Sequence, residues 1–518
     1  MKNIKSNINL LGKWVFRFLI IAFVIESIMH PALENLYGCF VILYAWCILN
    51  KFVLRLRNFE MAFLPTCALI GYVFCYFALP LFVTLLEGKP LTFNFAVPYL
   101  TFTNQFLNVT VIFFAYFCVL KCYKKNNAIA LFWKKIGYFS IPKERTIWIL
   151  GFCGTFCLFL NIGRQADDVE LQATTSLLDQ IVNLTQSFSV FPLSLLFPKF
   201  LGCNTKFKTQ RYVIPYILIL SLIGIATTRR ALVFNSLATI GILFFLKTII
   251  ENRKIVSLKM IIVGFFAFFI ISGPFTDMAT AMILNRKNIT SGSNTFEEVI
   301  RLYNNKEELH SLYNMFLLEK DNQGNNGLGW SEYYVDNIFL DRFCNIRVQD
   351  ATLYYTEKIG YANNIMKKYF YENFINHLPG FIVDILGEKK TVITTPIDHM
   401  VGSRWEGAGI GSWRVGGDTG IGLATMGYMY YPFAFLVYFF LFYFLSTCVW
   451  TINRDMYIIP LPILATMMWY FNYFDNAIGI YRSINYLLDS GWRSIIFYCI
   501  YIFVFNRIYS LLIKKGKV

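Results

Sequence analysis

Two adjacent arginines, Arg229 and Arg230, stand in the run TTRRA at the turn between two apolar stretches. Arg211 and Lys247 mark the far ends of these stretches, which leaves 35 residues (212–246) for a path across a membrane and back. Each leg is about 25 Å long as a helix, which barely crosses the hydrocarbon layer. The pair is therefore expected at the membrane boundary, where a lipid-linked phosphate or pyrophosphate fits its paired donors. The alternative is that both side chains reach ordinary headgroups or a loop carboxylate.

A glycine-dense run from Gly402 to Gly422, with the residues just before it, is a second place where chemistry is expected. Its polar candidates are Asp398, His399, Arg404, Glu406, Arg414 and Asp418, and they alternate with Trp405 and Trp413. Glycines allow close backbone approach, and tryptophan rings can stack on sugar faces. His399 beside Asp398 can act as a general base near neutral pH. The alternatives are a flexible loop leading into the membrane and an exposed structural histidine.

Two further groups of charges are weaker candidates. The first consists of Asp341, Arg342, Arg347 and Asp350. Its alternative interpretation is a solvated helix face with pairs spaced three residues apart. The second is Arg164 with Asp167 and Asp168. The chain contains no Walker loop, HExxH, zinc pattern or serine elbow, so no cofactor and no metal are expected.

Composition indicates which elements must position these residues. Of the 518 residues, 56% are hydrophobic and only 15% are charged. Because soluble domains average about 25% charged residues, the sequence predicts an integral membrane protein. The first apolar stretch, Ile8–Met29, carries Lys13 and Arg17 and has no small-residue cleavage site, so it is interpreted as a first membrane anchor.

Hydropathy predicts twelve membrane spans, of which the sixth is weak because Asp179, Gln180, Asn183 and Gln186 interrupt it. The spans are roughly 10–29, 36–54, 61–86, 104–120, 146–162, 177–198, 212–228, 231–247, 258–275, 420–448, 456–474 and 492–512. With the N-terminus inside, the inner connections and ends hold 27 Lys and Arg. The short outer connections hold six: Lys89, Arg164, Arg229, Arg230, Arg482 and Arg493. This asymmetry predicts that both termini are cytoplasmic.

A polar segment, residues 274–419, separates nine spans in 1–273 from three in 420–518, and it is predicted to be a large outer loop. It holds 14 Lys and Arg against 18 Asp and Glu, so the net charge of +16 comes from the rest of the chain. The basic excess is therefore expected to face anionic membrane lipids, and nucleic acid is not expected as a partner.

Within the polar segment, Thr295 followed by Glu298 predicts a helix start and a helix that extends to Phe316. A glycine-bearing turn at 321–329 is expected to break it. A second, amphipathic helical stretch is predicted from Ser331 to His377, and Leu378–Leu386 is expected to dip into the interface. The predicted fold is all-α, polytopic, with a helical cap outside the membrane.

Three local patterns resemble the Wzy family of O-antigen and oligosaccharide repeat-unit polymerases. TTRRALVFNSLATIGILFF resembles the arginine-led span that these proteins carry midway. HLPGFIVDILGEKK is similar to their short apolar, lysine-ended stretch in the outer loop, and GDTGIGLATMGYMYYPFAF to their glycine-tyrosine approach to the following span. The span count, the cytoplasmic ends and the single large outer loop also resemble this family.

The resemblance implies a GT-C-like fold and glycosyl transfer at the outer face of a bacterial inner membrane, in lipopolysaccharide or other surface-polysaccharide biosynthesis. The donor would be a growing glycan on undecaprenyl pyrophosphate, and the acceptor a single lipid-linked repeat unit. No nucleotide sugar or metal would be required, and a chain-length regulator protein would be a further partner. Candidates for stabilising the released pyrophosphate are Arg229, Arg230 and one of Arg404 or Arg414. Candidates for accepting the hydroxyl proton are His399, Glu406 and Asp418.

Two other functions fit parts of the same pattern. An O-antigen ligase shares the twelve-span plan but transfers the glycan to lipid A core. A lipid-linked oligosaccharide flippase is a transporter, which is expected to carry charges through its middle spans and only short outer loops. The predicted spans contain few ionisable residues beyond Arg17, Glu26 and Asp179, which favours an enzyme over a transporter.

Overall fold

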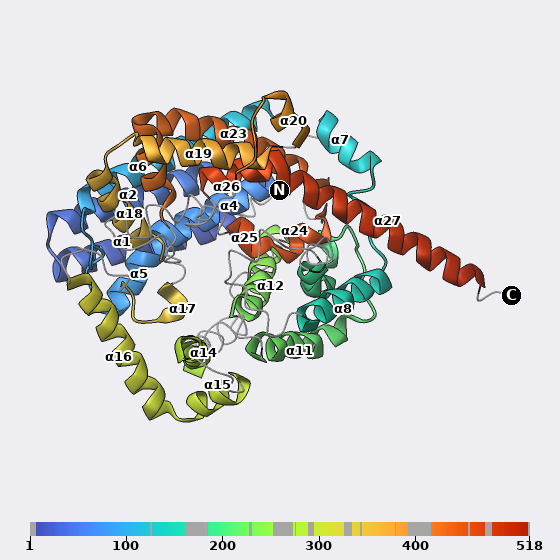
Figure 1. The fold of residues 1–518 in the computed structure, drawn as a ribbon, viewed down its shortest axis with the longest axis horizontal. Helices are drawn as coiled ribbons and strands as arrows, with labels where there is room; N and C mark the ends of the chain where they lie inside the picture. Colours follow the sequence, from blue (N-terminus) through green and yellow to red (C-terminus); the bar gives the residue numbers. More distant parts are fainter. Residues whose placement is uncertain are drawn as a thin grey trace, which may run out of the picture.

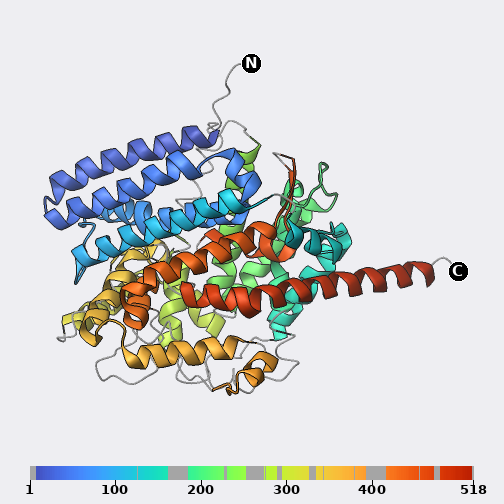
Figure 2. The same cartoon turned by 90° about the horizontal axis from the view of Figure 1, so that it is seen from above.

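The computed structural model describes the greater part of the chain. The described residues are 7–124, 127–160, 182, 185–226, 230–251, 273–274, 276–288, 295–325, 334–341, 344–378, 380–391, 416–453, 456–471 and 479–515. They form a mostly helical structure, in which long helices from the two ends of the chain lie side by side (Figures 1 and 2). The extensive contact between α6 (Pro98–Cys122) and α23 (Tyr430–Thr447) joins these two groups of helices.

The N-terminal helices form one layer of the structure. They are α1 (Asn7–Met29), α2 (Leu33–Ile48), α3 (Leu56–Met61), α4 (Phe63–Val73), α5 (Leu79–Leu86) and α6 (Pro98–Cys122). A π-helical turn, Leu49–Val53, prolongs α2, and another, Phe74–Ala78, joins α4 to α5. Pro98 stands in the first turn of α6, where a missing N–H costs no helical hydrogen bond. Pro80 lies inside the continuous helix Phe63–Leu86, just after its π-helical turn.

The C-terminal helices begin at the end of the polar segment. They are α22 (Asp418–Met426), α23 (Tyr430–Thr447), α26 (Ile480–Asn485) and α27 (Gly491–Lys515). A 3-10 turn, Gly427–Met429, joins α22 to α23, and Gly427 has φ 60°, which suits glycine. A π-helical turn, η8 (Tyr486–Ser490), joins α26 to α27.

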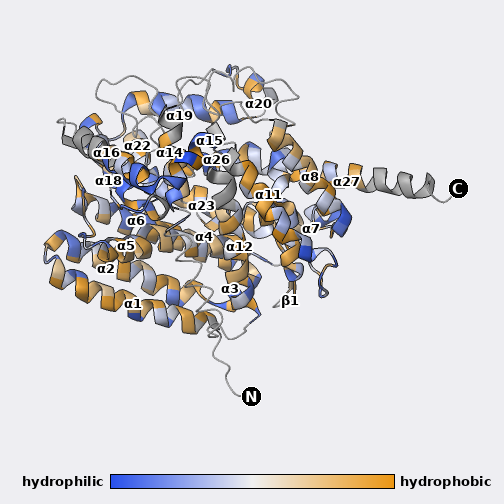
Figure 3. Cartoon of the chain, turned by 90° about the horizontal axis from the view of Figure 1, so that it is seen from below, coloured by the Kyte–Doolittle hydropathy of each residue, from blue (hydrophilic) through white to orange (hydrophobic). Residues whose placement is uncertain are grey.

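Five helices in the described part of the chain are long and apolar enough to cross a membrane. They are Leu33–Val53, Phe63–Leu86, Pro98–Cys122, Asp418–Thr447 and Ile480–Phe505. Colouring by hydropathy shows the same contrast, with α1 and α2 mainly apolar and α18 mainly polar (Figure 3). This supports the predicted class, a helical membrane protein. The total of twelve spans, the orientation and the GT-C-like arrangement stay predictions.

The middle of the chain contains shorter helices. They are α7 (Ala128–Lys135), α8 (Glu144–Leu160), the 3-10 helices η3 (Ser187–Leu196), η4 (Pro198–Phe200) and η5 (Gln210–Tyr212), α11 (Val213–Ala226) and α12 (Arg230–Ile250). Helices α11 and α12 pack against each other, as expected for the two legs of the predicted arginine-bearing hairpin. In the weak sixth span, η3 contains Pro192, which cannot donate a helical hydrogen bond. The predicted span 258–275 lies outside the described residues except for 273 and 274.

One expectation about the C-terminal part of the chain is wrong. The predicted eleventh span, 456–474, is not a single helix in its described part. Strand β2 (Met456–Ile458) pairs antiparallel with β1 (Trp450–Asn453), and two short helices follow, α24 (Leu461–Ala465) and α25 (Met467–Phe471). Pro460 and Pro462 explain the late helix start, because neither can donate a backbone hydrogen bond. The described residues are otherwise mostly helical, which agrees with the predicted all-α class, and this two-stranded hairpin is a small addition to it.

The polar segment forms seven helices in its described part. They are α14 (Thr276–Asn288), α15 (Thr295–Asn304), α16 (Lys306–Asn325), α17 (Ile338–Asp341), α18 (Ile346–Ile359), α19 (Asn364–His377) and α20 (Gly380–Ile385). The helix start at Thr295 is confirmed, but the first predicted helix is divided at Asn305 and runs on into the predicted turn. The second is divided as well: α18 ends at Gly360, with φ 86°, and the Asn363 side chain caps α19.

Candidate functional site

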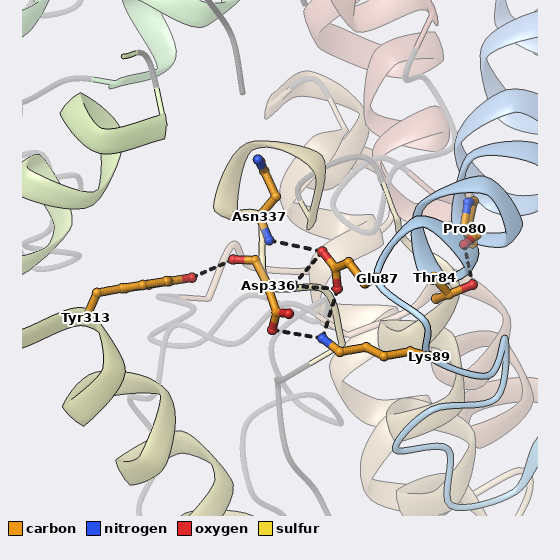
Figure 4. Close-up of polar contacts among 7 residues, drawn as sticks. All are labelled: Pro80, Thr84, Glu87, Lys89, Tyr313, Asp336 and Asn337. Atoms are coloured by element: carbon orange, nitrogen blue, oxygen red, sulfur yellow. Dashed lines mark hydrogen bonds and ion pairs between the residues drawn. The ribbon is translucent and has the colours of Figure 1, made fainter. Parts of the chain in front are cut away.

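Ion pairs attach the polar segment to the connection between α5 and α6 (Figure 4). Lys89 Nζ lies 2.8 Å from Glu87 Oε2 and 2.8 Å from Asp336 Oδ1. The backbone N–H groups of Asp336 and Asn337 donate to the Glu87 carboxylate, and the Tyr313 hydroxyl donates to the Asp336 carbonyl at 2.8 Å. We call Glu87, Lys89, Asp336 and Asn337 the clasp. It joins α16 and α17 to the end of α5.

A buried ion pair continues this attachment at the start of α6. Asp350 Oδ2 accepts hydrogen bonds from Arg347 Nη1 at 2.9 Å and from Ala96 N at 2.7 Å. Its Oδ1 accepts from Val97 N and Thr101 Oγ1, both at 3.0 Å. Burial raises the pKa of Asp350, and Arg347 with these donors partly offsets that effect. The carboxylate therefore caps the first turn of α6 and holds α18 against it.

For Arg347 and Asp350, the interpretation of this charge group as a solvated helix face is wrong. The pairing three residues apart is present, but the Asp350 side chain is 0% exposed and that of Arg347 only 4%. Periodicity could not distinguish the two cases, because a helix face packed on another helix has the same spacing as a solvated one. We refer to the clasp and the Arg347–Asp350 pair together as the anchor.

Asp418, a predicted proton acceptor, is buried at the start of α22. Its Oδ2 accepts hydrogen bonds from the hydroxyls of Tyr430 and Tyr438, each at 2.9 Å. Its Oδ1 accepts from Ile480 N at 2.7 Å. A Cβ added to Gly479 would lie 1.9 Å from Asp418 Oδ1, so only glycine permits this approach. The carboxylate thus joins α22, α23 and α26, and the residue is only 5% exposed.

Tyr481 and Arg482, which directly follow Ile480, line a cavity of about 740 Å³. Helix α19 of the polar segment forms one wall, and α24 to α27 with part of η3 form the others. Helix α19 packs against α22 and α26, and it lies beside α26 in Figure 1. The aromatic rings in the lining include Phe370, Phe374, Trp469, Tyr470, Tyr481 and Tyr486. The polar lining includes Asn373, Asn376, His377, Arg482 and Asn485.

Contacts between helices hold the aromatic wall in place. The Tyr481 hydroxyl donates to Thr425 Oγ1 of α22 at 2.7 Å, and its ring centroid lies 5.1 Å from that of Phe370. The hydroxyls of Tyr470 and Tyr486 are 3.0 Å apart. Because these rings are fixed before a ligand arrives, binding would cost little side-chain entropy.

The charges at the cavity favour an anionic ligand. No Asp or Glu is among the described residues that line it, whereas Arg482 and His377 are. Burial lowers the pKa of His377; Asp489 acts in the opposite direction, and Lys390 and Arg493 lower the pKa further. The imidazole is therefore neutral at neutral pH, while the guanidinium stays charged.

Comparison with protein-family models, curated proteins and solved structures found no match to this chain.

The arrangement suits a ligand with sugar rings and a phosphate. Aromatic faces stack on sugar rings, side-chain amides bond hydroxyls, and a guanidinium binds phosphate oxygens in pairs. Buried Asn485 Oδ1 has no hydrogen-bond partner, so it can accept from a ligand donor. Among the described residues, no group of three or more His, Cys, Asp or Glu could hold a metal ion.

The sequence-predicted residues lie in different places. Asp418 accepts a hydrogen bond from Ile480 N, next to the cavity residues Tyr481 and Arg482. Arg347 and Asp350 belong to the anchor. Arg230 begins α12, but its side chain is outside the described part. Arg164, Arg229, Arg342, His399, Arg404, Glu406 and Arg414 lie outside the described residues. The expected pairing of Arg229–Arg230 with the Gly402–Gly422 run therefore stays a prediction.

Sequence reasoning did not single out the cavity residues. Arg482 entered only as one of six basic residues in the outer connections, and His377 only as the end of an amphipathic stretch. A usable signal was the polar residues that interrupt the start of the last apolar stretch, notably Arg482, Asn485 and Asp489. That signal could not pair α26 with α19, which lies more than a hundred residues earlier.

Proposed function

We propose that this protein is a membrane glycosyltransferase that polymerises undecaprenyl-pyrophosphate-linked oligosaccharide repeat units, as the Wzy-type polymerases do, at the outer face of a bacterial inner membrane. The observation that carries the proposal is the cavity of about 740 Å³ between α19 of the polar segment and the apolar helix Ile480–Phe505. Such a position suits a substrate with one end in lipid and the other in water.

The reaction requires charge stabilisation and sugar binding, and the cavity lining can supply both. A hydroxyl oxygen of the acceptor sugar bonds to the anomeric carbon of the donor, and the bond from that carbon to the lipid pyrophosphate breaks. The leaving pyrophosphate gains negative charge, which the Arg482 guanidinium can stabilise. Because a guanidinium has five donors, Arg482 can do so while keeping a protein partner. The sugar rings stack on aromatic faces such as Tyr481 and Trp469.

The amphipathic character of the lining also supports this substrate class. A soluble nucleotide sugar would need a site for a base and ribose, whereas a lipid carrier needs an apolar route beside a polar cavity. Several side chains of α27 near the cavity are exposed and apolar, among them Ile496 and Ile500, each 50% exposed. In a membrane this face meets acyl chains, so a polyprenyl tail could lie along it.

The experiment is reconstitution of the purified full-length protein in liposomes with its lipid-linked repeat unit. We expect a ladder of lengthened glycans on the same lipid, without added nucleotide sugar or metal. Arg230→Ala is expected to abolish long chains while the protein still inserts into the membrane, as is Arg482→Ala. A normal ladder from both variants would contradict the proposal.

The same preparation distinguishes the two other functions. A ligase would leave the lipid-linked repeat unit at its original length and transfer it to lipid A core when that acceptor is added. A flippase would move the repeat unit between leaflets without lengthening it. Either result in place of a ladder would replace the polymerase assignment.

A further inference from the structure

We propose that His377 is the general base of the glycosyl transfer, accepting the proton of the attacking sugar hydroxyl. This inference rests on the proposed function and adds a catalytic residue to it. His377 is the last residue of α19 and the one histidine among the described residues that line the cavity. His310, by contrast, is exposed on α16, away from this lining.

Packing on both sides of α19 sets the position of His377. The Phe370 ring lies 6.1 Å from Phe433 of α23 and 5.1 Å from Tyr481 of α26, between centroids. Ile375 and Leu378, on either side of the histidine, are buried in a small apolar cluster. The imidazole is therefore attached to a packed helix end and not to a free loop, as a catalytic group requires.

The charges around His377 come from four elements. Asp489 lies on η8, Arg493 on α27 and Lys390 after α20, and Arg482 of α26 lines the same cavity. Arg493 Nη2 also forms an ion pair with Asp489 Oδ2 at 3.1 Å, which partly neutralises that carboxylate. Burial is the main cause that lowers the pKa of His377, and Lys390 and Arg493 add to it against Asp489. The imidazole is therefore neutral near pH 7, the form that can accept a proton.

The proton balance of the step is complete without another reactant. As the hydroxyl oxygen bonds to the anomeric carbon, its proton passes to an imidazole nitrogen of His377. The electron pair of the broken carbon–oxygen bond leaves with the lipid pyrophosphate. The resulting imidazolium then releases the proton to water, and the enzyme returns to its starting state.

His377 fits this role better than Asp418 does. Both oxygens of Asp418 already accept hydrogen bonds, two from tyrosine hydroxyls and one from Ile480 N. Asp418 is instead a positioning residue, because it fixes the first turn of α26 just before Tyr481 and Arg482. His399 and Glu406 lie outside the described residues and are the rivals that the experiment must separate.

The test compares His377→Gln with His310→Gln as the matched control, both as full-length protein in liposomes with the lipid-linked repeat unit. We expect His377→Gln to lower kcat about 100-fold or more, with KM changed far less. We also expect it to remove the acidic limb of the kcat–pH profile, which follows protonation of the base. His310→Gln is expected to match the unmodified protein.

A second variant keeps the inference testable if glutamine disturbs folding. Added imidazole should restore part of the activity of His377→Ala and leave His399→Ala and Glu406→Gln unaffected. An unchanged acidic limb in His377→Gln, or rescue of His399→Ala instead, would overturn the assignment. If the unmodified protein makes no polymer at all, it is the proposed function that fails, which is a different result.

Discussion

The anchor and the cavity are two places where the polar segment meets the apolar helices, and they use charge in opposite ways. At the anchor, Asp350 accepts four hydrogen bonds and Glu87 accepts from Lys89 and from backbone N–H groups. At the cavity, Arg482 and His377 line an open volume beside aromatic rings and amides. Both regions are rich in polar residues, yet only the cavity has room for a ligand.

The difference teaches how to interpret charge beside a membrane. A charged group with several partners inside the protein has its desolvation cost offset there and stabilises the fold. Arg482 is instead exposed at the cavity, so its donors can face a substrate. The substitutions below test this division, from the largest expected effect to the smallest.

Asp350→Ala is expected to destabilise the protein most, by about 3–5 kcal/mol, because it leaves the Arg347 guanidinium buried without its carboxylate. It also removes the acceptor for the N–H groups of Ala96 and Val97. Chemical unfolding in mixed detergent micelles measures the change. The double variant Arg347→Met/Asp350→Leu should recover much of the loss. A single variant as stable as the unmodified protein would show that the anchor is not a structural element.

Arg482→Ala is expected to lower the polymerisation rate about 100-fold, a loss of about 2.7 kcal/mol of transition-state stabilisation, with little change in unfolding. The rate of glycan lengthening in liposomes measures it. Arg301→Ala is the control, since Arg301 is exposed on α15 and forms ion pairs with Glu298 and Glu308. If both substitutions lower the rate of glycan lengthening equally, a charge at the cavity does not act differently from a charge on the surface.

Gly479→Ala is expected to cost about 1–3 kcal/mol of stability through overpacking, because the new Cβ would lie 1.9 Å from Asp418 Oδ1. It should also lower activity, since it moves the turn that carries Tyr481 and Arg482. Gly241→Ala in α12 is the matched control: no atom lies within 4 Å of its added Cβ, and alanine should stabilise the helix by about 1 kcal/mol. Both expectations are checked by measuring the free energy of unfolding and the rate of glycan lengthening for the two variants.

Asp336→Ala should have the smallest effect, below about 1 kcal/mol, because this carboxylate in the clasp is half exposed. Its backbone N–H still donates to Glu87 after the substitution. The remaining effect should shrink at high salt, which screens exposed charges. A loss as large as that of Asp350→Ala would mean that the exposed and buried parts of the anchor act as one network.

Much of the helical framework was predictable because apolar length and helix caps are local properties. In the described part of the chain, five long apolar helices overlap predicted spans, and the helix expected to start at Thr295 is present. The eleventh span failed because hydropathy does not register Pro460 and Pro462, which prevent one continuous helix. For the candidate site, the sequence singled out Asp418 but gave it the role of a base. The partners on which its proposed positioning role rests, Tyr430, Tyr438 and Ile480, belong to other helices.

The sequence by itself determined the helical membrane class, the polar segment and the stock of arginines and histidines available for chemistry. The tertiary structure decided which of these share a site. His377 and Arg482 line one cavity although 105 positions separate them, and Arg347 and Asp350 are buried against α6 and not solvated. The physical reason is that hydropathy and spacing are properties of one segment, whereas burial and hydrogen-bond partners are set by segments that meet only in the folded chain.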